Sequence, residues 1–347
     1  MTRARRKKWM DPISQGALGA VVAASWCKRA EARLAVGVGW AGGMLADADI
    51  FIRSERDPLL NIEYHRHFSH SLFFIPIGGL VCASFLWLLL RKRVTFAALY
   101  KYSTLGYATA GLLDACTSYG TRLLWPISEA RVAWNVISII DPVFTGTVLA
   151  LLAAGFITRK RILTRLAFAF ATVYLLLGFV QNRRATNAIR ELAEARGHSE
   201  ATRFTVKPSI GNLLVWRGMY ELEGDIRVDA IRVGLMKAEP IVYPGGLAKG
   251  VDLASLKKGI PSSSRLSHDL DRFDHFSDGY LAWHPNEPNT IGDARYAMLP
   301  NSLDPLWGIE VDVAQPDSHV RLVNFRVADE AALNALLNMI RGQEIER

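Results

Sequence analysis

The chain has 347 residues, of which 50% are hydrophobic and 21% are charged, and its mean hydropathy is +0.13. This length suffices for two domains, and the composition is too apolar for an evenly globular chain. Residues 1–181 hold 21 Lys and Arg against 10 Asp and Glu, whereas residues 182–347 hold 20 against 23. The net charge of +8 therefore comes entirely from the first half, where it clusters in short segments typical of membrane-protein loops. We expect no nucleic-acid partner.

Four apolar segments predict membrane-spanning helices, because about 20 apolar residues are needed to cross a bilayer. They cover residues 71–90, 96–116, 138–158 and 163–181. Residues 34–53 are a further candidate span that ends in acidic residues, whereas residues 13–26 are short and are expected to lie at the interface or to re-enter. The sequence thus predicts an α-helical polytopic membrane domain over residues 1–181.

Basic clusters set the expected orientation of these spans. They lie at residues 3–8, 91–93 and 159–161, and short loops rich in Lys and Arg face the cytoplasm. Alternation of the spans then places residues 54–70, residues 119–136 and the whole chain after residue 182 on the outer side of the membrane. Membrane lipid is therefore an expected partner.

The chain loses its apolar character after Gln181, and residues 182–347 are predicted to form a soluble, mainly β (α+β) extracytoplasmic domain. Residues 182–196 predict a helix that ends before Gly197. Short segments rich in β-branched and aromatic residues predict strands at 203–207, 212–221, 226–236 and 309–313. Residues 257–302 contain several Pro and Ser and are predicted to be loop-rich.

Several Asp and His residues fall at the outer ends of the predicted spans. Such groups cost about 2.5–3.5 kcal/mol at the centre of a membrane helix, so they are usually functional or paired. The set comprises Asp47, Asp49, His65, His67, His70, Asp114 and Asp141. Because imidazole and carboxylate groups suit zinc or a similar divalent ion, the set predicts a metal site. The alternative is that the histidines cap a helix and that the aspartates pair with Arg53, Arg66 and Arg122.

Spacing suggests a role for several of these residues. Residues three apart share one face of a helix, so His67 and His70 are expected to bind one ion, with His65 joining from the preceding turn. Asp47 and Asp141 are then catalytic candidates that orient ligands or take a proton from water. Arg122 is a third catalytic candidate, because guanidinium clamps phosphate or carboxylate; the alternative is an interfacial arginine that pairs with lipid headgroups.

These stretches resemble the YdjM-like family of bacterial inner-membrane proteins, which are described as membrane-bound metal-dependent hydrolases. The matching segments are Met10 to Gly16, Asp47-Ala48-Asp49, His65 to Ser71, Leu112 to Asp114 with Thr117 to Pro126, and Ile140-Asp141-Pro142. A further stretch, Val206 to Trp216, is similar to the tail of one branch of the family.

The resemblance implies an inner-membrane location and a metal centre carried by Asp49, His65, His70 and Asp114. In the family a histidine usually stands four residues before the aspartate at position 114, where this chain has Ala110. Some members also carry a histidine at the position of Gln15. His67 is the residue expected to compensate for Ala110.

The leading hypothesis is a hydrolase in which a metal-activated water attacks a phosphoester or ester of a lipid or envelope precursor at the outer membrane face. A second hypothesis is a non-catalytic scaffold or metal-binding module whose C-terminal domain binds a protein partner. A third is a small transporter that uses the Asp and His residues as an ion or proton path.

Overall fold

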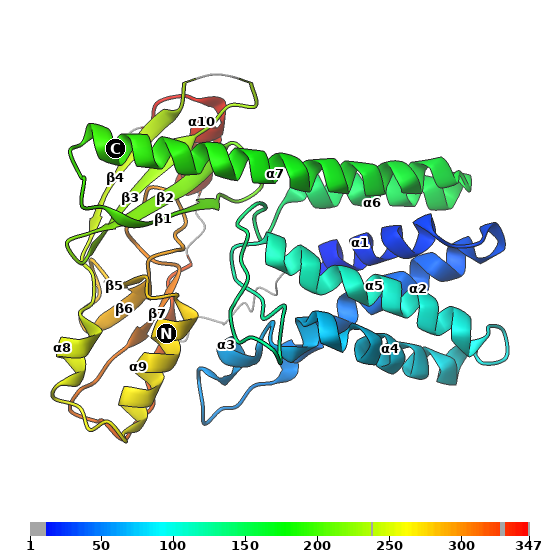
Figure 1. Ribbon diagram of the computed structural model, residues 1–347, viewed down its shortest axis with the longest axis horizontal. Helices are drawn as coiled ribbons and strands as arrows, with labels where there is room; N and C mark the ends of the chain where they lie inside the picture. Colours follow the sequence, from blue (N-terminus) through cyan, green and yellow to red (C-terminus); the bar gives the residue numbers. More distant parts are fainter. Residues whose placement is uncertain (1–11, 237–238, 327–329, 346–347) are drawn as a thin grey trace. The chain divides into compact units, whose positions relative to one another are not determined.

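The computed structural model describes residues 12–236, 239–326 and 330–345, and the chain divides into two compact units (Figure 1). The first unit comprises Met1–Ile50 and His65–Gly178, and the second comprises Phe51–Tyr64 and Phe179–Arg347. The basic cluster at residues 3–8 and the motif residues Met10 and Asp11 lie outside the described residues. Phe51–Tyr64, which separates two of the sequence motifs, thus belongs to the second unit.

The first unit is helical. Its helices are α1 (Pro12–Ser25), α2 (Ala32–Leu45), α4 (Ile75–Leu90), α5 (Phe96–Cys116), α6 (Pro142–Thr158) and the first part of α7 (Arg161–Ala195). Short 3-10 turns connect them: η1 (Arg29–Glu31), η2 (Ala46–Phe51), η3 (Phe68–His70) and η4 (Leu72–Phe74). Helix α7 is continuous over 35 residues, whereas the sequence predicted two separate helices here.

Among the described residues, three helical segments are long and apolar enough to cross a membrane. They are Arg29–Phe51, Leu72–Leu90 and Arg161–Ala195. Helix α6 is apolar but has only 17 residues, and α5 has 21 residues but includes Lys101 and several hydroxyl side chains. The helical character of the N-terminal region is therefore confirmed, and the full number of spans stays a prediction.

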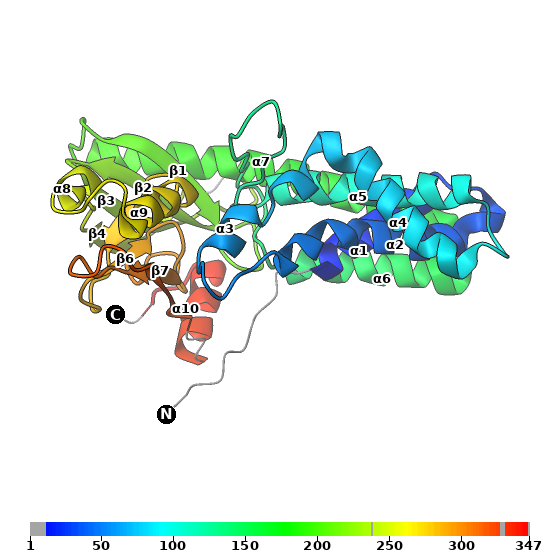
Figure 2. The same ribbon diagram turned by 90° about the horizontal axis from the view of Figure 1, so that it is seen from below.

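Glycines bring α1, α2 and α5 close together. A Cβ on Gly19 of α1 would lie 2.6 Å from the carbonyl oxygen of Gly39 in α2, and a Cβ on Gly106 of α5 would collide with the same oxygen. A Cβ on Gly43 of α2 would lie 2.5 Å from the carbonyl oxygen of Gln15 in α1. Such close backbone contact is typical of membrane helices, where van der Waals packing drives association. The three helices consequently lie side by side (Figures 1 and 2).

We expect Gly106→Ala to destabilise the helical unit by about 1–3 kcal/mol, because the added methyl group must push α5 away from α2. The measurement is the temperature at which the buried thiols of Cys27, Cys82 and Cys116 become reactive towards a thiol dye in detergent. Gly37→Ala is the matched control, since nothing lies within 4 Å of a Cβ at Gly37. Equal midpoints for the two variants would contradict the packing described here.

Two antiparallel sheets form most of the second unit. The first has the order β1-β2-β3-β4, with β1 (Thr202–Pro208), β2 (Val215–Leu222), β3 (Asp225–Arg232) and β4 (Ile241–Ala248). The second has the order β5-β6-β7-β8, with β5 (Leu281–Trp283), β6 (Thr290–Asp293), β7 (Trp307–Glu310) and β8 (Arg321–Asn324). The last part of α7 packs Ile189 against Trp216 and Ile231 of the first sheet. A β-rich C-terminal domain is therefore confirmed.

The sequence missed several elements of this domain. Strand β4 was not predicted, and it contains Pro244 and two glycines, which are rare in strands; it lies at the edge of its sheet and has a register shift opposite β3, where proline is tolerated. The region 257–302, predicted to be loop-rich, contains β5, β6 and helix α9 (Arg265–Phe276). Helix α9 was missed because many charged residues lie between its buried apolar residues, which include Leu266, Leu270 and Phe273. The remaining helices are α3 (Leu60–Tyr64), α8 (Leu253–Lys257) and α10 (Glu330–Arg341).

One arginine anchors the segment Phe51–Tyr64 within the second unit. Arg272 of α9 donates from both terminal nitrogens to Asp57, at 3.0 Å each, and from Nε to Glu63 at 2.9 Å. Burial alone would raise the pKa of Asp57, but the hydrogen bonds from Arg272 lower that pKa below its usual value. The connection between Asp49 and His65 is therefore held by an ion-pair network rather than left as an open loop.

Candidate metal centre

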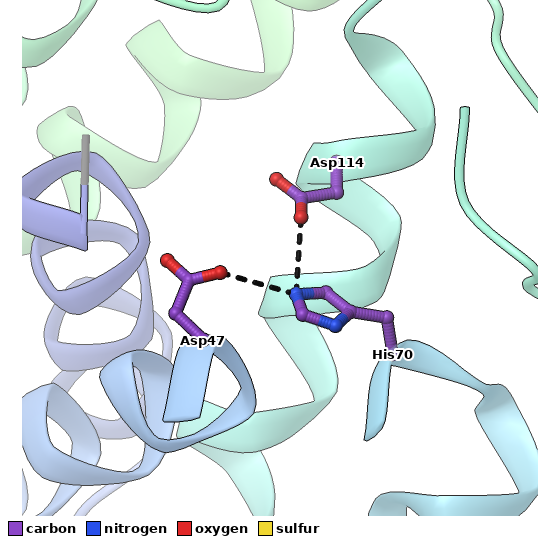
Figure 3. Close-up of side chains that lie close together, drawn as sticks. All are labelled: Asp47, His70 and Asp114. Atoms are coloured by element: carbon purple, nitrogen blue, oxygen red, sulfur yellow. Dashed lines mark ion pairs between the residues drawn. The ribbon is translucent and has the colours of Figure 1, made fainter. Parts of the chain in front are cut away.

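His70 lies at the centre of a buried cluster of carboxylates in the first unit. It ends η3, while Asp47 lies in η2 directly after α2 and Asp114 lies in the last turn of α5. The Nε2 atom of His70 is 3.0 Å from Oδ2 of Asp114 and 3.3 Å from Oδ1 of Asp47 (Figure 3). All three residues are buried, so these charges interact with little screening by water.

A third carboxylate holds the opposite side of the imidazole. Oδ2 of Asp49 lies 3.2 Å from Nδ1 of His70, and it also accepts hydrogen bonds from the Ser69 hydroxyl at 2.7 Å and from the Arg66 backbone at 2.8 Å. The other oxygen of Asp49 is 2.7 Å from Nδ1 of His65. Asp49 thus fixes the ring so that Nε2 of His70 faces Asp47 and Asp114. Metal-ligating histidines are usually oriented by a carboxylate in this way.

Arg66 and Gln15 supply the donors on the other side of Asp114. Nε of Arg66 lies 2.8 Å from Oδ2 of Asp114, and Nη1 donates to the Thr117 hydroxyl at 2.6 Å. Nε2 of Gln15 donates to Oδ1 of Asp114 at 2.9 Å and to Oδ1 of Asp47 at 3.3 Å. Arg66 has a left-handed backbone, with φ of 59°. Such a residue costs roughly 1–2 kcal/mol, so the surrounding bonds must hold it.

The geometry and charge of this cluster fit a divalent ion. One ligand atom each from Asp47, His70 and Asp114 lie within 4.8 Å of one another. Two ligands of a tetrahedral zinc ion lie roughly 3.3–3.6 Å apart, close to the 3.3 and 3.0 Å measured from His70. With neutral imidazoles, as in a metal site, the three buried carboxylates exceed the single guanidinium by two charges, which is the charge of such an ion. Three protein ligands also match catalytic zinc sites, which keep the fourth position open.

The other predicted ligands lie outside this group. His65 contacts Asp49, and its ring centroid is 6.3 Å from that of His70. Nε2 of His67 is 2.6 Å from Nη1 of Arg122, and the same guanidinium pairs with Glu129. Asp47, rather than the Asp49 that the resemblance implied, faces Nε2 of His70, and of the three arginines considered as partners of the aspartates Arg66 pairs with Asp114.

Asp141 lines a small polar pocket beside the cluster. It caps α6 by accepting from the Phe144 backbone at 3.0 Å, and it accepts from the Tyr174 hydroxyl at 2.8 Å. The pocket is lined by Ser14, Gln15, Arg66, Leu113, Asp114, Thr117, Ile137, Ser138, Ile139, Asp141, Phe144 and Thr145. Asp114 and Arg66 therefore belong both to the cluster and to the pocket, so a water molecule, which is about what the pocket can hold, would contact the candidate metal centre.

Ala110 also faces this region. Its buried side chain packs with Ala46, which directly precedes Asp47, and with Tyr107. The neighbouring Gly111 lies so close to the carbonyl oxygen of His70 that a Cβ there would collide with it. Small residues on α5 thus allow the histidine motif to approach Asp114. The position at which the family usually has a histidine is thus filled by the tightly packed methyl group of Ala110.

Sequence reasoning did not assign functional roles to Gln15, Arg66, Ser69 and Thr117. Arg66 and Ser69 lie inside the histidine motif, and Gln15 lies inside the first family segment. Their place inside these segments could have marked them as functional candidates. From the sequence, Arg66 was considered only as a salt-bridge partner and Gln15 only as a departure from the family.

A second group of metal-binding type, in the second unit, comprises Asp57, Asp269 and His319. Nη1 of Arg272 lies 3.0 Å from an oxygen of each carboxylate, and Nδ1 of His319 lies 2.7 Å from Asp269. Arg272 pairs with both of these carboxylates and with Glu63, so this group forms an ion-pair network in the structure.

Fold and cluster together define a helical membrane protein with a buried carboxylate–histidine centre. Residues 10–185 match the family model of the YdjM inner membrane protein, which covers half of the chain. The chain therefore belongs to the YdjM inner membrane protein family, which confirms the predicted resemblance and membrane location. No curated protein and no solved structure matches the chain.

If Asp47, His70 and Asp114 are the direct ligands, zinc titration in detergent should rank the variants. We expect His70→Ala and Asp47→Asn to abolish measurable zinc binding. Asp49→Asn should weaken it by about 10–100-fold, which is typical of residues that orient a ligand. Asp271→Asn, at an exposed surface pair with Lys257, should leave the affinity unchanged. Complete loss in Asp49→Asn with retention in Asp47→Asn would contradict this ligand set.

Proposed function

We propose that this protein is a metal-dependent hydrolase that acts on a phosphoester or ester of a lipid or envelope precursor at the membrane surface. The observation that carries the proposal is the orientation of His70, whose Nδ1 contacts Asp49 while Nε2 faces Asp47 and Asp114. This set lies directly beside a polar pocket that shares Asp114 and Arg66. A bound divalent ion, zinc or a similar metal, supplies Lewis acidity that lowers the pKa of water to about 7.

The chain's own residues have distinct roles in this proposal. Asp47, His70 and Asp114 hold the ion, and Asp49 orients the imidazole through Nδ1. Arg66 binds the anionic group of a substrate from the pocket wall, because guanidinium recognises phosphate and carboxylate. Asp141 also lines the pocket and accepts the proton of the attacking water, while its hydrogen bonds to Tyr174 and the α6 backbone hold its carboxylate in place.

A structural role for the cluster is the second candidate. Arg66 contacts the same Asp114 oxygen that faces His70, at 2.8 Å, and the Gln15 amide bridges Asp47 and Asp114. These donors compensate part of the carboxylate charge without an ion, and such buried networks also specify one packing arrangement. In this alternative the protein is a membrane scaffold whose C-terminal domain binds a protein partner.

The hydrolase proposal predicts zinc-dependent cleavage by the purified full chain in detergent. Suitable probes are bis(p-nitrophenyl) phosphate and, separately, phosphatidylglycerol in mixed micelles. We expect His70→Ala and Asp47→Asn to lower turnover by at least about 1,000-fold and Asp141→Asn by about 100–10,000-fold, as for loss of a general base. Asp271→Asn serves as the folded control. Zinc binding without cleavage of either probe would favour the structural alternative.

We further propose that the cluster and the C-terminal domain lie outside the cytoplasm. The basic residues Arg91, Lys92 and Arg93 join the end of α4 to the start of α5, whereas His70 precedes α4 and Asp114 lies in the last turn of α5. The cluster is thus at the helix ends opposite the basic connection, and basic connections face the cytoplasm.

Reporter fusions test this orientation. Alkaline phosphatase, which is active only outside the cytoplasm, should be active when fused after Gln181 and inactive when fused after Arg93. Green fluorescent protein should give the reverse pattern at the same two positions. The opposite result for both reporters would overturn the orientation and place the cluster at the cytoplasmic face.

A further inference from the structure

Two loops of the second unit, before β2 and after β3, are hydrogen-bonded to α7 at the turn where its sequence changes from apolar to charged. The buried side chain of Gln181 donates from Nε2 to the carbonyl oxygens of Leu213 and Val233, at 3.1 Å each, and of Gly234 at 3.4 Å. Arg184, one turn later, donates to the carbonyl oxygens of Gly234 and Met236. The loop after β3 therefore follows α7 closely through this turn.

The tips of these loops are apolar and exposed. Leu235 and Met236 are 60% and 84% exposed, and Ile210, in the loop before β2, is 45% exposed. The apolar surface of α7 continues up to the same level, because Phe179 and Val180 are also exposed. Arg183 and Arg184 follow at once in the sequence. Exposed apolar residues from three separate segments are thus associated with the turn of α7 at which this candidate membrane span changes from apolar to charged residues.

Distances along the helix place these tips within the membrane interface. Gln181 and Arg184 are three residues apart, which corresponds to about 4.5 Å of helix rise. The polar headgroup layer on each side of the bilayer is roughly 5–8 Å thick. A loop bonded to both residues therefore lies within this layer if α7 spans, and its side chains are long enough to reach the acyl chains.

We propose that Leu235 and Met236, supported by Ile210, insert into the boundary between headgroups and acyl chains and attach the C-terminal domain to the lipid surface. The exposed Arg183 matches this position, because arginine beside an apolar anchor contacts lipid phosphate. The occupant of this surface is the bilayer itself, since the apolar tips continue the apolar surface of α7. This inference is independent of the proposed hydrolase activity.

Site-specific fluorescence tests the insertion. The full chain carries Met236→Cys or, as a matched control, Val313→Cys, labelled with the environment-sensitive dye NBD. Val313 follows β7 in the second sheet and is 56% exposed. The three natural cysteines are buried, and the unmodified chain gives the labelling background. Both proteins are reconstituted in phosphatidylethanolamine and phosphatidylglycerol vesicles, with either doxyl-labelled lipid or aqueous iodide as quencher.

We expect the dye at position 236 to be quenched by doxyl lipid about threefold more strongly than the dye at position 313, and by iodide about threefold more weakly. Equal quenching at both positions by both reagents would show that the loop lies in water, and this would overturn the proposal. Protection of position 236 from both quenchers would also overturn it, because a protein partner or a second copy would then cover the loop. Both substitutions are at exposed side chains, so the variants retain the fold.

Discussion

The contacts of His70 join three separate parts of the chain. Nδ1 bonds Asp49, while Nε2 faces Asp47 and Asp114 at 3.3 and 3.0 Å. The end of α2, the turn before α4 and the end of α5 therefore meet at one imidazole ring. Buried carboxylates are costly unless they are paired or bind a cation, so this meeting requires compensating positive charge. Arg66 supplies one part of it, and a divalent ion would supply the rest.

Close helix packing makes that meeting possible. Gly39, Gly43 and Gly106 let α1, α2 and α5 approach until backbone atoms are in contact, and Gly111 does the same between α5 and the His70 backbone. Side chains at the ends of these helices can then share hydrogen bonds, as Gln15 shares its amide between Asp47 and Asp114. The glycines therefore determine how closely the helices approach, and this approach sets the distances at which the buried polar side chains interact.

Sequence reasoning predicted the helical first half, the β-rich second half and the segments that carry the cluster. These followed from long apolar runs, from β-branched segments and from costly Asp and His residues at helix ends. It assigned Asp49 to the metal and Asp47 to catalysis, but the two residues lie two apart in a 3-10 turn, and Asp47 faces Nε2 of His70 while Asp49 faces Nδ1. Only the path of the backbone determines which carboxylate faces Nε2 of His70.

His67 shows a second limit of spacing rules. The rule that residues three apart share a face applies only inside a helix, but η3 begins at Phe68 and His67 precedes it. The left-handed backbone of Arg66 turns the chain just before this point, so His67 pairs with Arg122 instead. Strand β4 was missed for a similar reason, since Pro244 signals a turn in isolation and is accommodated only because β4 is an edge strand.

X-ray absorption at the zinc edge tests the ligand set most directly. Zinc-loaded full-length protein should show a first shell of nitrogen and oxygen atoms at about 2.0–2.2 Å, with the outer-shell scattering of one imidazole per zinc ion. His65→Ala should leave that spectrum unchanged, because His65 contacts Asp49 and lies away from the Asp47, His70 and Asp114 ligand atoms. Scattering from two imidazoles that falls to one in His65→Ala would contradict the account and restore His65 as a direct ligand.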